Sequence, residues 1–260
     1  MEDIIYEKHH RVWGAAWITI NRPDVMNAFR GQTLQEMYDA VQAASADPEV
    51  GVIVITGAGD RAFCAGGDVR WLQEVQRGDA GSMVDPHAGI EGCLKPVIAR
   101  VNGYAVGGGN HLAYFADFTI ASDRAVFAQV GPHVGSPASG HFVSYLTYVV
   151  GAKKAKEMWM LCRRYSAQEA LQMGLVNVVV TREKLDDEVD MWCAELMQKS
   201  PSCLKILKAS FRSLYEPLRE TSRMDWVGAY APAFYRSGEA DEGKVAFLAR
   251  REPDFSRFPR

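Results

Sequence analysis

The sequence lacks several features that define whole classes of protein. Its five cysteines are an odd number without a CxxC pair, so we expect reduced thiols and neither a disulfide framework nor a zinc site. It has no basic tract and a net charge of −3, which argues against a nucleic-acid partner. No apolar run reaches the roughly 18 residues of a membrane span, and the first ten residues lack the basic and apolar regions of a signal peptide. We therefore expect a cytoplasmic protein without a metal, nucleic-acid or membrane partner.

What is present is typical of a soluble globular chain. Of the 260 residues, 48% are hydrophobic and 23% charged, enough apolar sequence for a full core. This length suits one large α/β domain, or one domain with a small appendage.

The first half of the chain alternates apolar strands with helices. Thr33 and Glu36 have the spacing of a capping box, which predicts a helix over 33–44. Right-handed crossovers should join the strands into a parallel sheet. The expected strands lie at 13–20 and 50–57 and in KPVIARVNG (95–103) and ADFTIAS (116–122), with a short helix over 109–115.

The second half is mostly helical. Ser166 and Glu169 form another possible capping box, and Ser200 before Pro201 is a typical helix start. Further helices are expected at 184–199, 201–214 and 217–235, after a helix that ends at Gly174. We therefore predict a core domain over 1–200 and a helical C-terminal region over 201–260.

One glycine motif fits a dinucleotide-binding fingerprint only formally. GAGDRA (57–62) follows an apolar strand and matches GxGxxA, but a helix must open there to face the pyrophosphate. The chain instead continues into FCAGGD, where two more glycines disfavour a helix start. The sequence also has no GK[ST] phosphate-binding loop, so we expect neither a dinucleotide-binding fold nor a P-loop.

Two other glycine-rich stretches each follow an apolar strand. FCAGGD (63–68) and GYAVGGGN (103–110) free backbone N–H groups to point at a ligand. Side by side, two such N–H groups could hold one carbonyl oxygen as an oxyanion hole. Each stretch alone favours a tight turn in an ordinary sheet, but the two stretches together, at this spacing, favour the oxyanion hole.

These stretches resemble the crotonase, or enoyl-CoA hydratase, superfamily over nearly the whole chain. The resemblance rests on AFCAGGD and KPVIARVNGYAVGGG, with ITINRPDVMNAF and SAQEALQMGLVNVVV in support. It implies a crotonase-type ββα spiral core with a helical C-terminal trimerisation region, and an acyl-CoA substrate. By motif position, the thioester oxygen would be held by the N–H groups of Gly67 and Gly108.

Both acids that hydratases of the superfamily use are missing here. Their positions correspond to His111, two residues after the triple glycine, and to Gly131. Adding water to a double bond needs acid and base groups at those points, so simple hydration is disfavoured. His111 either substitutes as a base or is a packed helix residue.

Three further stretches resemble the naphthoate-synthase-like branch and its relative 2-ketocyclohexanecarboxyl-CoA hydrolase. They are GPHVGS, AKKAKEMWMLCRRYSAQEALQMGLVN and the tail EGKVAFLARREPDFSRFPR. The branch has a serine matched by Ser136, an aspartate replaced here by Ala138, and a tyrosine matched by Tyr235. Because the rest of the site is intact, we favour an engineered variant in which Ala138 replaces a native aspartate. The alternative is that alanine is the natural residue at position 138 and that the protein uses another base, such as His111 or His141.

The resemblance also implies contacts with coenzyme A, which is part of the substrate, so no separate cofactor is expected. It implies a homo-oligomer, a trimer or a dimer of trimers, in which residues of one subunit reach the neighbour's adenine and phosphate. The residues implied in substrate or CoA binding are Ala28, Ala65, Gly66, Asp68, Gly131, Phe247 and Arg250.

Synthases of the branch carry a tyrosine in the segment after GGD. Here no tyrosine lies between Tyr38 and Tyr104, which favours the ring-opening hydrolase over the ring-closing synthase. A third hypothesis is an acyl-CoA-binding protein without activity, because Ala138 cannot act as a base. The segment 69–92 is expected to be a mobile loop that forms one wall of the acyl pocket.

Overall fold

The computed structural model describes residues 1–77 and 86–258. The chain forms two compact units. The first consists of Met1–Phe127 and Tyr165–Leu214, and the second consists of Ala128–Arg164 and Tyr215–Arg260. Within the described ranges, no helix is long and apolar enough to cross a membrane.

A six-stranded sheet forms the centre of the first unit. Its strand order is β1-β2-β3-β5-β7-β10; β1 and β2 pair antiparallel and the other neighbours pair parallel. The central strand β3 is buried at every position, as a parallel strand covered on both faces should be. The bounds are β1 Ile4–Lys8, β2 Ala15–Ile20, β3 Val52–Gly57, β5 Val97–Val101, β7 Phe118–Ser122 and β10 Val178–Val180.

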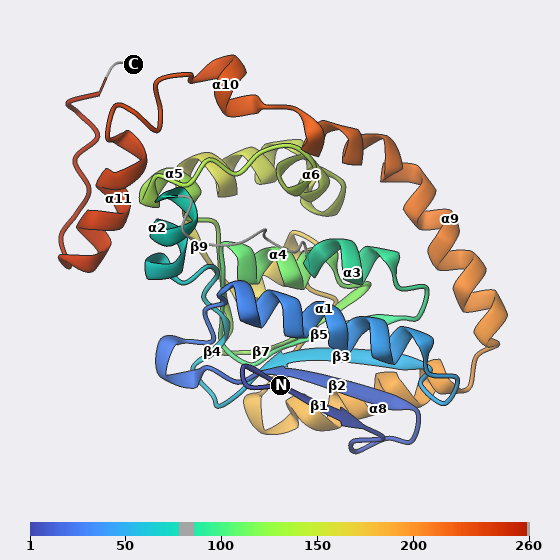
Figure 1. The fold of residues 1–260 in the computed structure, drawn as a ribbon. Coiled ribbons are helices and arrows are strands. Elements are labelled where there is room, and N and C mark those ends of the chain that lie inside the picture. The colour runs from blue at the N-terminus through green and yellow to red at the C-terminus, as the bar shows by residue number, and fades with distance from the viewer. Residues whose placement is uncertain (78–85, 259–260) are drawn as a thin grey trace. The chain divides into compact units, whose positions relative to one another are not determined.

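Helices cover both faces of this sheet, so the predicted α/β class is confirmed (Figure 1). Helices α1 (Gly31–Ala46) and α4 (Gly108–Phe115) lie on one face, and α3 (Pro86–Gly92) packs against both of them. Helix α8 (Leu185–Met197) covers the opposite face.

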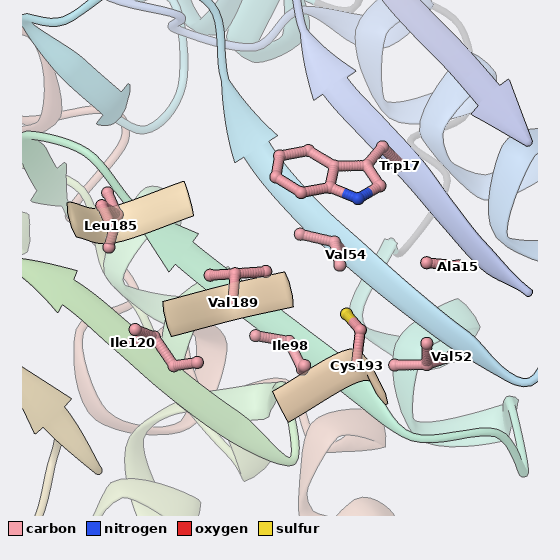
Figure 2. Close-up of a cluster of buried hydrophobic side chains, with 9 residues drawn as sticks. All are labelled: Ala15, Trp17, Val52, Val54, Ile98, Ile120, Leu185, Val189 and Cys193. Atoms are coloured by element: carbon pink, nitrogen blue, oxygen red, sulfur yellow. The ribbon is translucent and has the colours of Figure 1, made fainter. Parts of the chain in front are cut away.

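The face under α8 is a dry hydrophobic cluster. Leu185, Val189 and Cys193 of α8 are completely buried against side chains of four strands (Figure 2). Burying a Leu or Val side chain contributes about 1.5–3 kcal/mol, so α8 fixes the sheet firmly. The sheet residues of the cluster are Ala15, Trp17, Val52, Val54, Ile98 and Ile120.

A second sheet of short strands carries the glycine turns. Its order is β4-β6-β8-β9, and β4 (Ala62–Cys64) pairs parallel with β6 (Tyr104–Val106). Because the two strands are parallel, their carboxyl ends lie at the same edge of the sheet. The turns that follow them are therefore neighbours. The other strands are β8 (Val126–Ala128) and β9 (Arg164–Ser166).

The predicted capping box of α1 is wrong. The Thr33 hydroxyl accepts the N–H of Arg30 at 3.1 Å and donates to an Asp3 carboxylate oxygen at 2.6 Å. Glu36 accepts the backbone N–H groups of residues 2–4 instead. The helix therefore begins two residues earlier than predicted, and Glu36 binds the backbone at the start of β1.

Other local predictions are confirmed. The Glu169 N–H donates to the Ser166 hydroxyl at 3.3 Å, and a Glu169 carboxylate oxygen accepts the Ser166 N–H at 2.8 Å. This capping box starts α7 (Ala167–Gln172). Ser200 accepts a backbone N–H in the first turn of α9 (Pro201–Arg219).

Two segments differ from their predictions. In place of one helix over 217–235 there are the end of α9, a 3-10 turn (Glu220–Arg223) and α10 (Trp226–Tyr230), which Asp225 caps through the Gly228 N–H. In place of a loop over 69–92, the described parts are helical, as α2 (Val69–Arg77) and α3. Residues 78–85 of that expected loop lie outside the described residues.

The second unit is built from helices. Helix α5 (Gly131–Val134) packs against α6 (His141–Leu161) and α11 (Glu239–Leu248). The contact of α5 with α11 needs two glycines: a Cβ atom added at Gly243 would lie 2.3 Å from the Val134 backbone, and one at Gly135 3.0 Å from the α11 backbone. The expectation that residues 201–260 pack on a neighbouring subunit stays a prediction. The remaining short 3-10 helices are Pro23–Val25 and Arg182–Lys184.

Candidate active site

The two glycine turns touch at the edge of the small sheet. Gly66 has φ of +90°, a conformation that favours glycine. A Cβ atom added at Gly66 would lie 2.9 Å from the Val106 carbonyl oxygen and 3.2 Å from the Gly108 nitrogen. Only a glycine therefore lets the first turn approach the second this closely.

A short bridge to Phe29 sets the direction of the first turn. The Phe29 N–H donates to the Gly66 carbonyl and the Asp68 N–H donates to the Phe29 carbonyl, each at 2.8 Å. In such a parallel bridge the residue between the two bonds directs its own N–H to the opposite side. That residue is Gly67, so its N–H points away from Phe29.

The second turn ends in the first residue of a helix. Gly108 is the N-terminal residue of α4, and the first N–H groups of a helix have no acceptor within it. They also lie at the positive end of the helix dipole, which favours a negative ligand atom. Gly107, with φ of 56° and ψ of −121°, makes the sharp entry that presents the Gly108 N–H.

Close packing explains why glycine occurs three times in succession. A Cβ atom at Gly108 would lie 2.5 Å from the Phe29 ring, and one at Gly109 would lie 1.9 Å from the Cys64 carbonyl oxygen. Gly109 thus lets α4 rest directly on β4, while Gly107 makes the turn. These approaches are of backbone to backbone and of backbone to ring, and the approach to a ligand oxygen stays a prediction.

Asn27 and Arg22 hold the segment that carries Ala28 and Phe29. The completely buried Asn27 amide donates to the Ala58 carbonyl at 2.9 Å and to the Ala62 carbonyl at 2.8 Å. Arg22 donates to the Ala28 carbonyl at 2.5 Å. It also donates to the Asp68 carboxylate at 3.2 Å.

Cys64 at the end of β4 is not a nucleophile. Burial raises the pKa of its thiol to about 12, so it stays protonated at neutral pH. Its sulfur instead accepts the Gly66 N–H at 3.4 Å. Cys64 therefore supports the turn as a packed thiol.

In the second unit, Gly131 and Ser136 lie at the two ends of one tight turn. The Ser136 N–H donates to the Gly131 carbonyl at 2.9 Å, and the Ala138 N–H donates to the Ser136 carbonyl at 3.0 Å. A Cβ atom at Gly131 would lie 2.8 Å from the Ser136 carbonyl oxygen. This turn therefore has no room for a longer side chain at position 131. Ser136 is half-buried and Ala138 is exposed.

The other predicted residues of this unit are on its surface. Tyr235 is 52% exposed in a turn after α10, with its ring edge-on to Phe234 at 5.2 Å. Phe247 on α11 is 60% exposed, and Arg250 follows that helix with φ of 54°. Their predicted roles, in catalysis and in binding CoA across a subunit interface, stay predictions.

The His111 ring contacts one aromatic ring on α3 and one on α4. Its ring centroid lies 5.6 Å from that of His87 and 5.5 Å from that of Tyr114. His141, the other alternative base, is buried on α6 beside Tyr145 and Tyr215, with ring separations of 5.4 and 6.0 Å.

The structure gathers the predicted residues in two groups. In the first unit the glycine turns and the Phe29 segment bring together Ala28, Ala65, Gly66, Gly67, Asp68 and Gly108. In the second unit one turn brings together Gly131, Ser136 and Ala138.

The sequence analysis missed Phe29, which contacts the first group, and His87, which contacts His111. Phe29 is the last residue of ITINRPDVMNAF, and the resemblance of that stretch to the superfamily was the signal that could have identified it. His87 lies in a seven-residue helix with two glycines, whose sequence has no helical pattern that could have revealed it. In residues 1–77 and 86–258, no cluster of three His, Cys, Asp or Glu side chains could hold a metal ion.

Comparison with known proteins shows the family of the chain. A family model described as enoyl-CoA hydratase/isomerase matches residues 12–257. An enoyl-CoA hydratase/isomerase from Xanthobacter autotrophicus Py2 is 31% identical, with a TM-score of 0.77 over 99% of both chains. An enoyl-CoA hydratase from Mycobacterium avium subsp. paratuberculosis K-10 is 28% identical, with a TM-score of 0.82 over 97% of this chain and 98% of that one. The chain therefore belongs to the enoyl-CoA hydratase/isomerase family of the crotonase superfamily.

Proposed function

We propose that the protein hydrolyses a ring carbon–carbon bond of 2-ketocyclohexanecarboxyl-CoA, giving a dicarboxylic acyl-CoA such as pimeloyl-CoA. Family membership supports an acyl-CoA substrate, and the two adjacent glycine turns supply the N–H groups that such chemistry needs. The reaction would belong to the degradation of alicyclic and aromatic acids.

The turn at Gly131 carries the proposal. A glutamate there would bring its Cβ atom to 2.8 Å from the Ser136 carbonyl oxygen, so the turn as built excludes the acid. The other acid position is His111. Since double-bond hydration needs acid and base groups at both points, the glycine at position 131 disfavours hydration, and a reaction that shares the oxyanion hole but needs no acid at position 131 is favoured.

The N–H groups of Gly67 and Gly108 would hold the thioester oxygen. Negative charge grows on this oxygen as the thioester becomes an enolate, so fixed donors stabilise the transition state more than the substrate. In other enzymes the loss of one such donor costs about 2.7–4 kcal/mol.

Ring opening then proceeds in three balanced steps. The oxygen of water bonds to the ketone carbon as a base takes its proton. The bond from that carbon to the thioester α-carbon breaks, and its electron pair enters the thioester enolate. The α-carbon finally takes a proton, so that one water is added in total.

Residues of the second unit would supply the acid and base groups for these three reaction steps. A carboxylate at position 138, beside Ser136, would suit the base, and Ala138 cannot replace it. The Tyr235 hydroxyl would donate a proton or hydrogen bond during bond cleavage. Phe247 and Arg250 would contact the adenine and phosphate of CoA in a neighbouring subunit of a trimer or hexamer, where the planar guanidinium suits phosphate. Coenzyme A arrives with the substrate, and the mechanism requires no other cofactor.

Two alternatives make different predictions. A 1,4-dihydroxy-2-naphthoyl-CoA synthase would close a ring instead, and the VGS sequence ending at Ser136 suits both enzymes. A binding protein without activity would suit Ala138. Incubation of the protein and of Ala138→Asp with 2-ketocyclohexanecarboxyl-CoA decides: a ring-opened product from either supports the hydrolase, and tight binding without turnover by both supports the binding protein.

A further inference from the structure

Two histidine rings meet where helices α3 and α4 pack together beside the second glycine turn. His87 on α3 is only 6% exposed, and its ring centroid lies 5.6 Å from that of His111 on α4. We propose that His111 transfers the proton of the thioester α-carbon and that His87 is its positioning residue. The proposal rests on the proposed function for its substrate class, an acyl-CoA held by Gly67 and Gly108.

The geometry of α4 directs His111 toward the oxyanion site. His111 follows Gly108 by three residues, so the two lie on the same face of the helix. Side chains of a helix lean toward its N-terminus, the end from which the Gly108 N–H points. The imidazole therefore extends toward the oxygen that Gly108 would hold, and the α-carbon is one bond from the carbon that carries this oxygen.

His87 is held so that it can fix the neighbouring ring. Its ring also contacts Phe115 at 5.1 Å, and α3 lies beside α4 in the fold (Figure 1). Gly89 lets α3 approach α1, because a Cβ atom there would lie 3.2 Å from the Tyr38 ring. A buried imidazole in contact with another can select its tautomer and orientation through a hydrogen bond.

Several titratable groups surround the histidine pair. Glu91 is 4% exposed and stands one turn after His87 on α3, hence on the same helix face. Tyr114 on α4 contacts the His111 ring at 5.5 Å. The other titratable groups on the elements packed against α3 and α4 are Glu36, Tyr38 and Asp39 on α1, Cys64 on β4, Arg100 on β5 and Tyr104 on β6.

The proton transfer balances without another reactant. In the forward direction an imidazolium N–H of His111 gives its proton to the α-carbon, the enolate electron pair forms the C–H bond, and the thioester carbonyl is restored. His111 is left neutral and regains a proton from solvent. In reverse, neutral His111 removes an α-proton from the product.

The reverse step gives a direct assay. Pimeloyl-CoA is incubated with the protein in heavy water, and uptake of deuterium at the α-carbon is followed by mass spectrometry. We expect uptake above the enzyme-free rate, and a fall of about 10²-fold for His111→Asn, the size of a lost acid/base group. Added imidazole should restore part of the rate to His111→Ala, which a purely structural residue would not allow. His10→Asn, two residues beyond the end of β1, is the control and should leave the rate unchanged.

Two substitutions separate the two possible roles of His87. His87→Phe keeps the aromatic packing against Phe115 and loses the ring nitrogens, whereas His87→Gln keeps a hydrogen-bonding group and loses the aromatic ring. If His87 positions His111, His87→Phe should lower kcat for exchange about tenfold and leave KM unchanged. This loss is smaller than the loss of an acid/base group. His87→Gln should retain more activity than His87→Phe. Thermal unfolding and CoA-ester binding verify that each variant is folded.

The outcomes distinguish this proposal from the proposed function. The proposed roles of His111 and His87 are overturned if the unmodified protein shows no exchange, or if His87→Phe is more active than His87→Gln. Ring opening with unchanged exchange in the His111 variant also overturns it, while the proposed function stands. Exchange that depends on both histidines without any ring opening supports the pair and overturns the proposed function.

Discussion

Replacing Gly108 by proline and by alanine separates the N–H group of this residue from its packing. A Cβ atom at this position lies 2.5 Å from the Phe29 ring, so the ring must move in both variants. Gly108 is the first residue of α4, a position that tolerates proline. The preceding Gly107 has ψ of −121°, outside the helical region that a following proline disfavours. The two variants therefore share the strain of the added Cβ atom, and only Gly108→Pro also replaces the N–H by the ring Cδ atom.

The difference between the variants measures the oxyanion contact. Loss of one donor corresponds to about 2.7–4 kcal/mol, or roughly 10²–10³-fold in kcat. We expect Gly108→Pro to lie below Gly108→Ala by this factor in ring opening, with similar affinity for the CoA ester by calorimetry. Equal kcat values for the two variants would refute the assignment of this N–H.

Three further predictions concern the second unit. Ala138→Asp should raise ring opening by about 10²-fold or more, the size of a restored general base; no gain, or good activity with Ala138 in place, would contradict it. Tyr235→Phe should lower kcat by roughly 10²-fold with little change in thermal stability, and equal activity would make this exposed tyrosine a surface aromatic. A hydrogen bond from Arg251 is the main cause that lowers the pKa of Glu242 from 4.5 to about 2. Because the folded pKa lies below the unfolded one, this stabilisation is present above about pH 4.5 and is lost as pH falls toward 2. Acid unfolding should therefore depend less on pH in Glu242→Gln, and an unchanged profile would exclude the contribution of this carboxylate.

Local patterns predicted those elements that local contacts determine. The capping box of Ser166 and Glu169 closes within one helical turn, and the sequence therefore identified it. Thr33 and Glu36 have the same spacing, but the chain brings residues 2–4 to the Glu36 carboxylate from more than 30 positions away. No sequence pattern within the helix shows that distant backbone N–H groups bind the Glu36 carboxylate in place of the helix start.

The same distinction applies to the site. Each glycine turn was predictable because it directly follows an apolar strand. The approach of Gly66 to Gly108 depends on the pairing of β4 with β6, and their motif positions indicated it only through resemblance. The contact of His87 with His111 arises from the packing of two helices that the sequence does not connect, so it could be found only in the structure.

The mass of the product made from 2-ketocyclohexanecarboxyl-CoA tests the central claim most directly. The unmodified protein and Ala138→Asp are each incubated with this thioester, and the CoA-containing products are analysed by mass spectrometry and chromatography. The proposed function predicts a CoA ester that is heavier by one water, has an opened ring and forms faster with Ala138→Asp. Unchanged substrate with both proteins, or free CoA released with the ring intact, would contradict it.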